Sequence, residues 1–166
     1  MAEQKHLDAL AKFLRRPQKI LVQENNVLVL KENGLNVQGF LSIAKHLTRT
    51  SNQQVLLGKT PAEQAFVDQW LEYMILNLDA KTDKYSSLQD LNSYLSDRVY
   101  MIGNCITLAD LLLFFALHQT MSELTFQEKE KFLHLSRWYD NLQYQYNFRE
   151  SYSLLHFQKN CLYGSS

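Results

Sequence analysis

The longest uninterrupted hydrophobic run of the chain extends from Leu111 to Leu117, with the sequence Leu-Leu-Leu-Phe-Phe-Ala-Leu. A segment that is apolar on every side is typical of a helix buried in a core, and this run is too short to cross a membrane. Thr107 and Asp110 stand just ahead of it at the N-cap and N3 positions of a capping box. We therefore predict a central buried helix from Thr107 to about Ser122, with Thr107 and Asp110 as its structural cap.

The first 50 residues change from helical to extended patterning and back. Glu3 to Arg16 has apolar residues at helical spacing and ends before Pro17, so it predicts an amphipathic helix. Two short apolar runs, Ile20–Val22 and Val27–Leu30, predict strands. Gly39 to Arg49 returns to helical spacing. The order helix, strand, strand, helix predicts a small α/β piece that needs a larger neighbour to complete its core.

After residue 50 the pattern is helical throughout. Thr60-Pro61-Ala62-Glu63 is a capping box that opens a long helix to about Leu78, and Thr125 with Glu128 forms another such box before a short helix. Two apolar stripes along the long helix, one through Phe66, Trp70 and Tyr73, predict burial on two sides. Further helices are expected over residues 87–97, 135–144 and 149–155. We predict an N-terminal domain over 1–50, a linker over 51–59 and a helical domain over 60–166.

Composition narrows the function only slightly. The 166 residues carry 17 basic and 17 acidic side chains, although residues 1–50 hold 8 basic and 4 acidic ones. Cys105 and Cys161 lack disulfide or metal-binding spacing, and the histidines are scattered. With neither a signal peptide nor a transmembrane run expected, we predict a cytoplasmic protein, with the nucleus also open to a chain of this size.

The helical half with its Thr107-Leu-Ala-Asp110 cap, preceded by a small α/β piece, resembles the glutathione transferase superfamily. The resemblance implies a mostly helical α+β fold, with a reduced thioredoxin-like N-terminal piece followed by an all-helical C-terminal domain. More specific runs resemble the members of this superfamily that assemble with aminoacyl-tRNA synthetases: Leu56–Gly58, Gln69–Tyr73, Asp90–Leu95, Gln127–Lys131 and Ser136–Trp138.

The superfamily invites an enzyme hypothesis, which the site positions contradict. Its enzymes use a Tyr, Ser or Cys at the end of the first strand, and Ile20–Val22 offers none nearby. They also use a cis-proline, whose position here falls at about Val27, and an acid-Ser pair, which aligns with Gly39-Phe40. We therefore expect no catalytic residue, no cofactor and no metal, and hence no enzymatic activity.

A partner-binding role fits the sequence better. Arg137 lies beside an apolar stripe that includes Trp138, and a guanidinium at the rim of an aromatic patch is a good interface anchor. The resemblance implies that this helix crosses its counterpart on a partner, and that a second face includes Phe40, Gln69 and Tyr73. It further implies a scaffold of the multi-synthetase complex, a hetero-oligomer with the transferase-like domains of methionyl-tRNA synthetase and glutamyl-prolyl-tRNA synthetase, and a nuclear role in DNA-damage signalling.

Two alternatives stay open. One is a divergent transferase that uses either Cys105, whose thiol stands just ahead of a helix N-terminus, or an unrecognised N-terminal donor. The other is tRNA binding by the basic first helix through Lys12, Arg15 and Arg16. We expect neither direct nucleic-acid binding nor membrane association as the main role.

Overall fold

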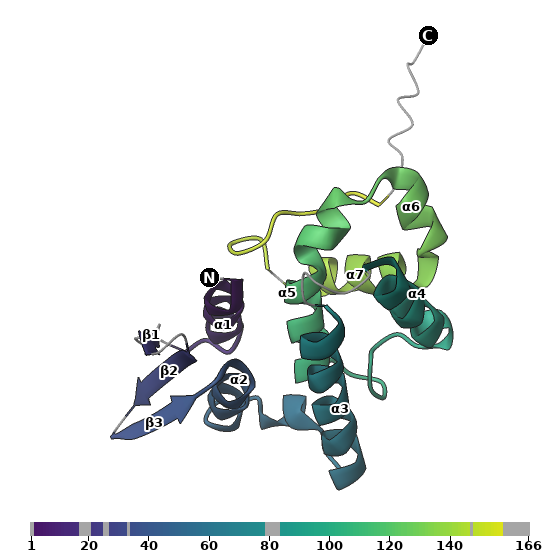
Figure 1. Cartoon of the computed structure of the whole chain (residues 1–166). Coiled ribbons are helices and arrows are strands. Elements are labelled where there is room, and N and C mark those ends of the chain that lie inside the picture. The colour runs from purple at the N-terminus through teal and green to yellow at the C-terminus, as the bar shows by residue number, and fades with distance from the viewer. Residues whose placement is uncertain are drawn as a thin grey trace.

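The computed structural model describes residues 2–16, 21–24, 27–32, 34–78, 84–146 and 148–157. The N-terminal piece consists of α1 (Ala2–Phe13), β1 (Leu21–Glu24), β2 (Val27–Glu32), β3 (Leu35–Gln38) and α2 (Phe40–Arg49). Its antiparallel sheet has the order β1-β2-β3, with Leu21 opposite Leu30 and Glu32 opposite Leu35. α1 and α2 lie between this sheet and the helical part (Figure 1). Pro17 and Ile20, which the sequence placed at the end of the first helix and the start of the first strand, lie outside the described residues.

The strand β3 was absent from the expected order of elements, so the prediction of two strands was wrong. Leu35 is exposed and Val37 is only partly buried, which leaves the short segment without a strong hydrophobic signal. Main-chain pairing with β2 holds it in place instead, and the N–H of Gly39 then donates to the carbonyl of Leu28 at 2.9 Å. The sheet edge therefore forms through the backbone, which periodicity of side chains does not report.

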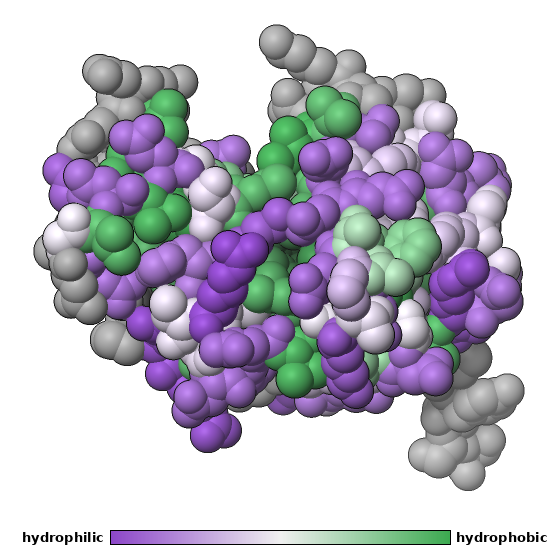
Figure 2. Space-filling model, turned by 90° about the horizontal axis from the view of Figure 1, so that it is seen from below, coloured by the Kyte–Doolittle hydropathy of each residue, from purple (hydrophilic) through white to green (hydrophobic). Residues whose placement is uncertain are grey.

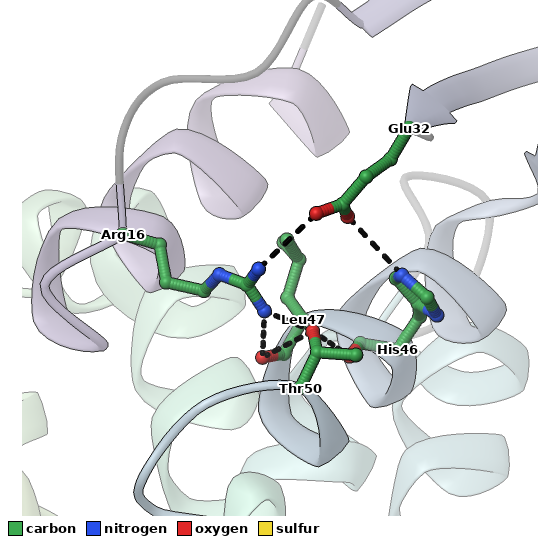
Figure 3. A network of polar contacts seen from close by, with 5 residues as sticks. All are labelled: Arg16, Glu32, His46, Leu47 and Thr50. Atoms are coloured by element: carbon green, nitrogen blue, oxygen red, sulfur yellow. Dashed lines mark hydrogen bonds and ion pairs between the residues drawn. The ribbon is translucent and has the colours of Figure 1, made fainter. Parts of the chain in front are cut away.

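A polar network ties the end of α1 to β2 and α2 (Figure 3). The Arg16 guanidinium donates to Glu32 Oε1 at 3.2 Å, to the Thr50 hydroxyl and to the carbonyl of Leu47 at 3.4 Å. Glu32 Oε2 lies 3.2 Å from His46 Nε2. The carboxylate of Glu32 thus joins both helices, and Arg16 also donates to the Leu47 carbonyl near the C-terminal end of α2, where a cation is favoured.

The helical part follows the predicted order closely. It contains η1 (Gln54–Leu57), α3 (Pro61–Asn77), α4 (Lys84–Tyr94), η2 (Leu95–Asp97), α5 (Leu108–Glu123), α6 (Phe126–Lys131) and α7 (Leu133–Gln145). The capping boxes at Thr60 and Thr125 are both formed, each with its glutamate three residues on. η1 occupies the segment expected to be a linker, and α4 begins at Lys84 rather than at Ser87.

The central buried helix is confirmed as α5. Its residues from Leu108 to Phe115 are all buried, and α1 and α3 pack directly against it while α7 crosses close by (Figure 1). The Phe114 ring stacks on the ring of Tyr139 with 4.2 Å between the centroids, which joins α5 to α7. Within the described ranges, no helix has both the length and the apolar content that a membrane crossing requires.

Two expectations about the helical part were wrong. Residues 149–155 form turns and irregular backbone rather than a helix. This segment packs through Phe148, Tyr152 and Leu155, and the side chain of Gln143 pairs with the main chain of Leu155. The aromatic stripe of α3 is also not fully buried, because Phe66 is 51% exposed. Trp70 and Tyr73 of this stripe are partly buried and pack against the core, whereas the other stripe is buried through Val67, Leu71 and Met74.

Candidate functional site

The cap of α5 is a buried network of hydrogen bonds. The N–H and the hydroxyl of Thr107 both donate to Asp110 Oδ2, at 3.0 and 2.8 Å. The N–H of Met101 donates to Asp110 Oδ1 at 2.8 Å, and the Trp138 indole N–H donates to the same atom at 3.0 Å. Burial raises the pKa of Asp110, and the four donors oppose that rise. Every donor around this carboxylate belongs to the chain itself, so the geometry is that of a structural group.

Arg137 is exposed on α7 but is held in place. Its Nη2 donates to the carbonyls of Leu95 and Arg98, each at 2.8 Å, so it spans from α7 to the end of η2. These bonds occupy one nitrogen of the guanidinium fork, which has five N–H donors in all. A surface arginine that is fixed before binding loses less side-chain entropy when it meets a partner.

Trp138 does not accompany Arg137 at the surface, so its assignment as a partner-binding residue was wrong. Its side chain is 1% exposed and lies against α5. The exposed neighbours of Arg137 are Leu133 and Tyr144, each 62% exposed. Spacings of i, i+4 and i+11 place these three residues on one side of a helix, whereas i+5 turns Trp138 toward the core. We call Leu133, Arg137 and Tyr144 the α7 face. A helical projection of the sequence would have shown this grouping.

The second predicted face needs a similar correction. Phe40 is 8% exposed, and its ring packs edge-on against the ring of His6 on α1, so its side chain is not a surface contact. Gln69 is exposed, and the Tyr73 hydroxyl approaches Asp90 Oδ2 at 3.5 Å. Burial and the Asp90 carboxylate raise the pKa of Tyr73. Phe66 and Leu76 share the same side of α3. We call Phe66, Gln69, Tyr73 and Leu76 the α3 face.

The positions that carry glutathione chemistry in transferases hold different groups here. Gly39 stands at the N-cap of α2 without a side chain to offer, and Phe40 points into the core. Val27 is the first residue of β2. Cys105 is a free, exposed thiol ahead of α5, and Cys161 lies outside the described residues. In the described parts of the chain, no three His, Cys, Asp or Glu side chains gather to hold a metal ion.

The basic residues near the end of α1 are partly engaged within the protein. The Lys12 ammonium lies 4.0 Å from Glu150 Oε2, and Arg16 forms the network with Glu32 already described. Arg15 is exposed and has a positive φ of 53°. The structure therefore does not bring Lys12, Arg15 and Arg16 together as a row of equivalent free cations.

Comparison with known proteins finds a matching family model and several relatives. A family model described as nuclear-export cofactor Arc1p matches residues 63–146. The chain is 45% identical over 147 residues to eukaryotic translation elongation factor 1 epsilon-1 of Cricetulus griseus, and the match covers 86% of this chain and 84% of that protein. It is 32% identical over 109 residues to the bifunctional glutamate/proline--tRNA ligase of the same organism, covering 65% of this chain and 7% of the ligase.

The fold is shared with solved glutathione transferases. The delta-class glutathione transferase of Nilaparvata lugens superposes with a TM-score of 0.75 at 17% identity, covering 92% of this chain and 89% of that one. The predicted transferase-like fold, with its small α/β piece and its helical part, is thereby confirmed. At this level of identity the likeness concerns the fold alone.

Proposed function

This chain belongs to the family of eukaryotic translation elongation factor 1 epsilon-1, and from that we infer that it is a non-catalytic scaffold subunit that joins aminoacyl-tRNA synthetases. We propose the transferase-like domains of methionyl-tRNA synthetase and glutamyl-prolyl-tRNA synthetase as its partners, in a cytoplasmic hetero-oligomer. A scaffold of this kind raises the effective concentration of each partner near the other.

The α7 face is the observation that carries this proposal. It combines two largely exposed apolar side chains, Leu133 and Tyr144, with Arg137, which the carbonyls of Leu95 and Arg98 already orient. Tyrosine and arginine are among the residue types most enriched at the energetic centres of interfaces. The similarity of this chain to a segment of the ligase supports a partner with a related domain, and we propose that such a pair packs equivalent helices around a pseudo-two-fold axis.

The α3 face supplies a separate surface for the second partner. Phe66 and Leu76 are exposed apolar residues on the same side of α3 as the exposed Gln69 and the partly buried Tyr73. Two faces on different helices allow both synthetases to bind at once. The proposal thus assigns one partner to each face.

Capture of the two purified synthetases by the immobilised chain tests this function. We expect Leu133→Glu and Arg137→Ala each to weaken the binding of one synthetase by at least roughly tenfold. We expect Phe66→Glu to weaken the binding of the other synthetase. Gln127→Ala, an exposed change on α6, serves as the matched control. Because Arg137→Ala also removes two internal hydrogen bonds, its melting temperature is measured alongside, whereas Leu133→Glu alters the surface alone.

Two results would overturn the proposal. The first is undiminished capture of both synthetases by all three interface variants. The second is turnover of a chlorinated aromatic compound with glutathione by the unmodified chain, which would make it an enzyme. If the two faces are separate, each variant should lose the binding of one synthetase and keep the binding of the other.

A further inference from the structure

A groove of about 570 Å³ lies between the C-terminal end of α2, the short helix η1 and the start of α3. Figure 2 views the protein from the side on which η1 and the start of α3 lie, and strongly hydrophilic residues there adjoin hydrophobic ones. Lys45, Arg49 and Lys59 line the groove together with the acid Asp68 and the apolar residues Val55 and Leu57. The groove therefore combines positive charge with apolar surface.

The wall of this groove is fixed by a close approach of the backbone. Gly58 has a φ of +103°, and a Cβ atom at this position would lie 2.7 Å from the backbone nitrogen of Gln64. The Gln64 side-chain amide donates to the carbonyl of Gly58 at 3.3 Å, and the N–H of Lys59 donates to Glu63 Oε2 at 2.7 Å. The turn that carries Lys59 is thus pressed against the first turn of α3 and held there.

Two cations of the groove are left unbalanced. The Lys45 ammonium lies 2.7 Å from Asp68 Oδ1, so this pair neutralises itself and links α2 to α3. Arg49 and Lys59 are exposed, and neither has an acid within ion-pair distance among the residues that the structure describes. A built concavity with two uncompensated positive charges attracts acidic groups.

The apolar part of the groove favours an acidic peptide over a nucleic acid as its ligand. Val55 is 54% exposed at the groove, and Leu57 lines it as well. Contact with a nucleic-acid backbone uses charge and hydrogen bonds, whereas a peptide that carries both acidic and apolar side chains also buries Val55. We propose that this groove binds an acidic segment of a partner protein, with carboxylates at Arg49 and Lys59 and a bulky apolar side chain against Val55 and Leu57.

The groove is separate from the two faces of the proposed scaffold. Gln64 and Asp68 precede Gln69 and Tyr73 by five residues each, and side chains at i and i+5 point about 140° apart around a helix. Asp68 also pairs with Lys45 of α2, so the acidic segment binds where α3 faces α2 and uses none of the residues of the α3 face. The inference holds whether or not the chain associates with synthetases.

Fluorescence anisotropy of the full chain with a labelled peptide of repeated Glu-Glu-Leu units tests the inference. We expect saturable binding that falls by at least roughly tenfold in the double variant Arg49→Gln, Lys59→Gln. Lys131→Gln, an exposed basic change on α6, is the matched control and should leave binding unchanged. A peptide in which Gln replaces Glu, and another in which Ser replaces Leu, should both bind more weakly than the parent peptide.

Four outcomes would overturn the inference: no binding of the acidic peptide, equal binding by the double variant, equal binding of the Gln-substituted peptide, or equal binding of the Ser-substituted peptide. A single-stranded RNA that binds more tightly than the peptide, through the same Arg49 and Lys59, would also overturn it in favour of a nucleic-acid site. The melting temperature of the double variant shows whether it folds. Val55→Asp is a second variant, which retains both cations and should also bind the peptide more weakly.

Discussion

The indole N–H of Trp138 donates to Asp110 Oδ1 across 3.0 Å, which bonds the cap of α5 directly to α7. Both side chains are buried, and the same carboxylate also accepts from Met101 and from Thr107. One acidic residue therefore begins the central helix, fixes the loop before it and anchors the helix that carries Arg137. The position of the α7 face depends on this internal contact.

Replacing Asp110, a buried capping-box residue, should destabilise the protein far more than replacing a capping-box residue that is exposed to solvent. Asp110→Ala leaves four buried donors without their acceptor, and we expect a loss of about 3 kcal/mol or more in the free energy of unfolding. Glu63→Ala removes the matching N3 residue of the capping box at the exposed start of α3, where water replaces the lost acceptor. We expect that variant to lose about 1 kcal/mol. Urea unfolding measures both, and equal losses would show that burial of the cap is unimportant.

Gly58 is required both for its backbone conformation and for its lack of a side chain. In Gly58→Ala the new Cβ would meet the backbone of Gln64 at 2.7 Å, so we expect a loss of roughly 3 kcal/mol or more. Gly34→Ala is the matched control, since Gly34 has a φ of +80° but no atom within 4 Å of an added Cβ. Its loss should be about 1 kcal/mol, from the backbone strain alone. If thermal unfolding gave equal losses for the two variants, the close approach at Gly58 would not matter.

The sequence predicts the helical part well because its signals are local. Capping boxes identify the starts of α3 and α6, at Thr60 and Thr125, and an apolar run from Leu111 identifies the central helix. Each of these signals depends on residues within a few positions of one another. The α/β piece was harder to predict. β3 has a weak side-chain pattern, and its pairing with β2 is set by the backbone.

The partner-binding residues were only partly predictable. Arg137 and Gln69 are exposed as expected, whereas Trp138 and Phe40 are buried, because an apolar residue next to a surface residue can turn toward either side. The orientation of a helix against its neighbours decides this, and no single segment encodes it. The groove at η1 was not predicted at all, since it is assembled from residues of α2, η1 and α3 and depends on the contact between Gly58 and Gln64.

Stability should fall in mild acid because His6 resists protonation. Burial, with the charges of Lys5 and His118 nearby, lowers the pKa of His6 from 6.5 to about 4, and its Nδ1 lies 2.6 Å from the Tyr152 hydroxyl. Between these two pH values the unfolded chain binds a proton that the folded chain does not, so stability is fully present above pH 6.5 and declines down to about pH 4. His6 is only partly buried, so we expect a loss on the order of 1 kcal/mol.

The variant His6→Gln should flatten this acid-dependent decline. Urea midpoints between pH 7 and pH 4 measure it, and the lowered pKa of His118 leaves a remaining slope. Lys5→Met, which removes one cause of the shift but keeps the imidazole, should flatten the decline only in part. An unchanged pH dependence in His6→Gln would assign the decline to other groups.

Gln143 holds the C-terminal segment to α7 by imitating a strand pairing. Its Nε2 donates to the carbonyl of Leu155 at 2.8 Å, and its Oε1 accepts from the N–H of Leu155 at 3.1 Å. Gln143→Ala leaves both main-chain groups without a buried partner, so we expect a loss of about 2 kcal/mol and much faster hydrogen exchange at the Leu155 amide. Gln127→Ala, on the exposed surface of α6, controls for the loss of a glutamine. Protection at Leu155 that survived in Gln143→Ala would mean that the buried rings of Phe148 and Tyr152 hold the segment without this pair of bonds.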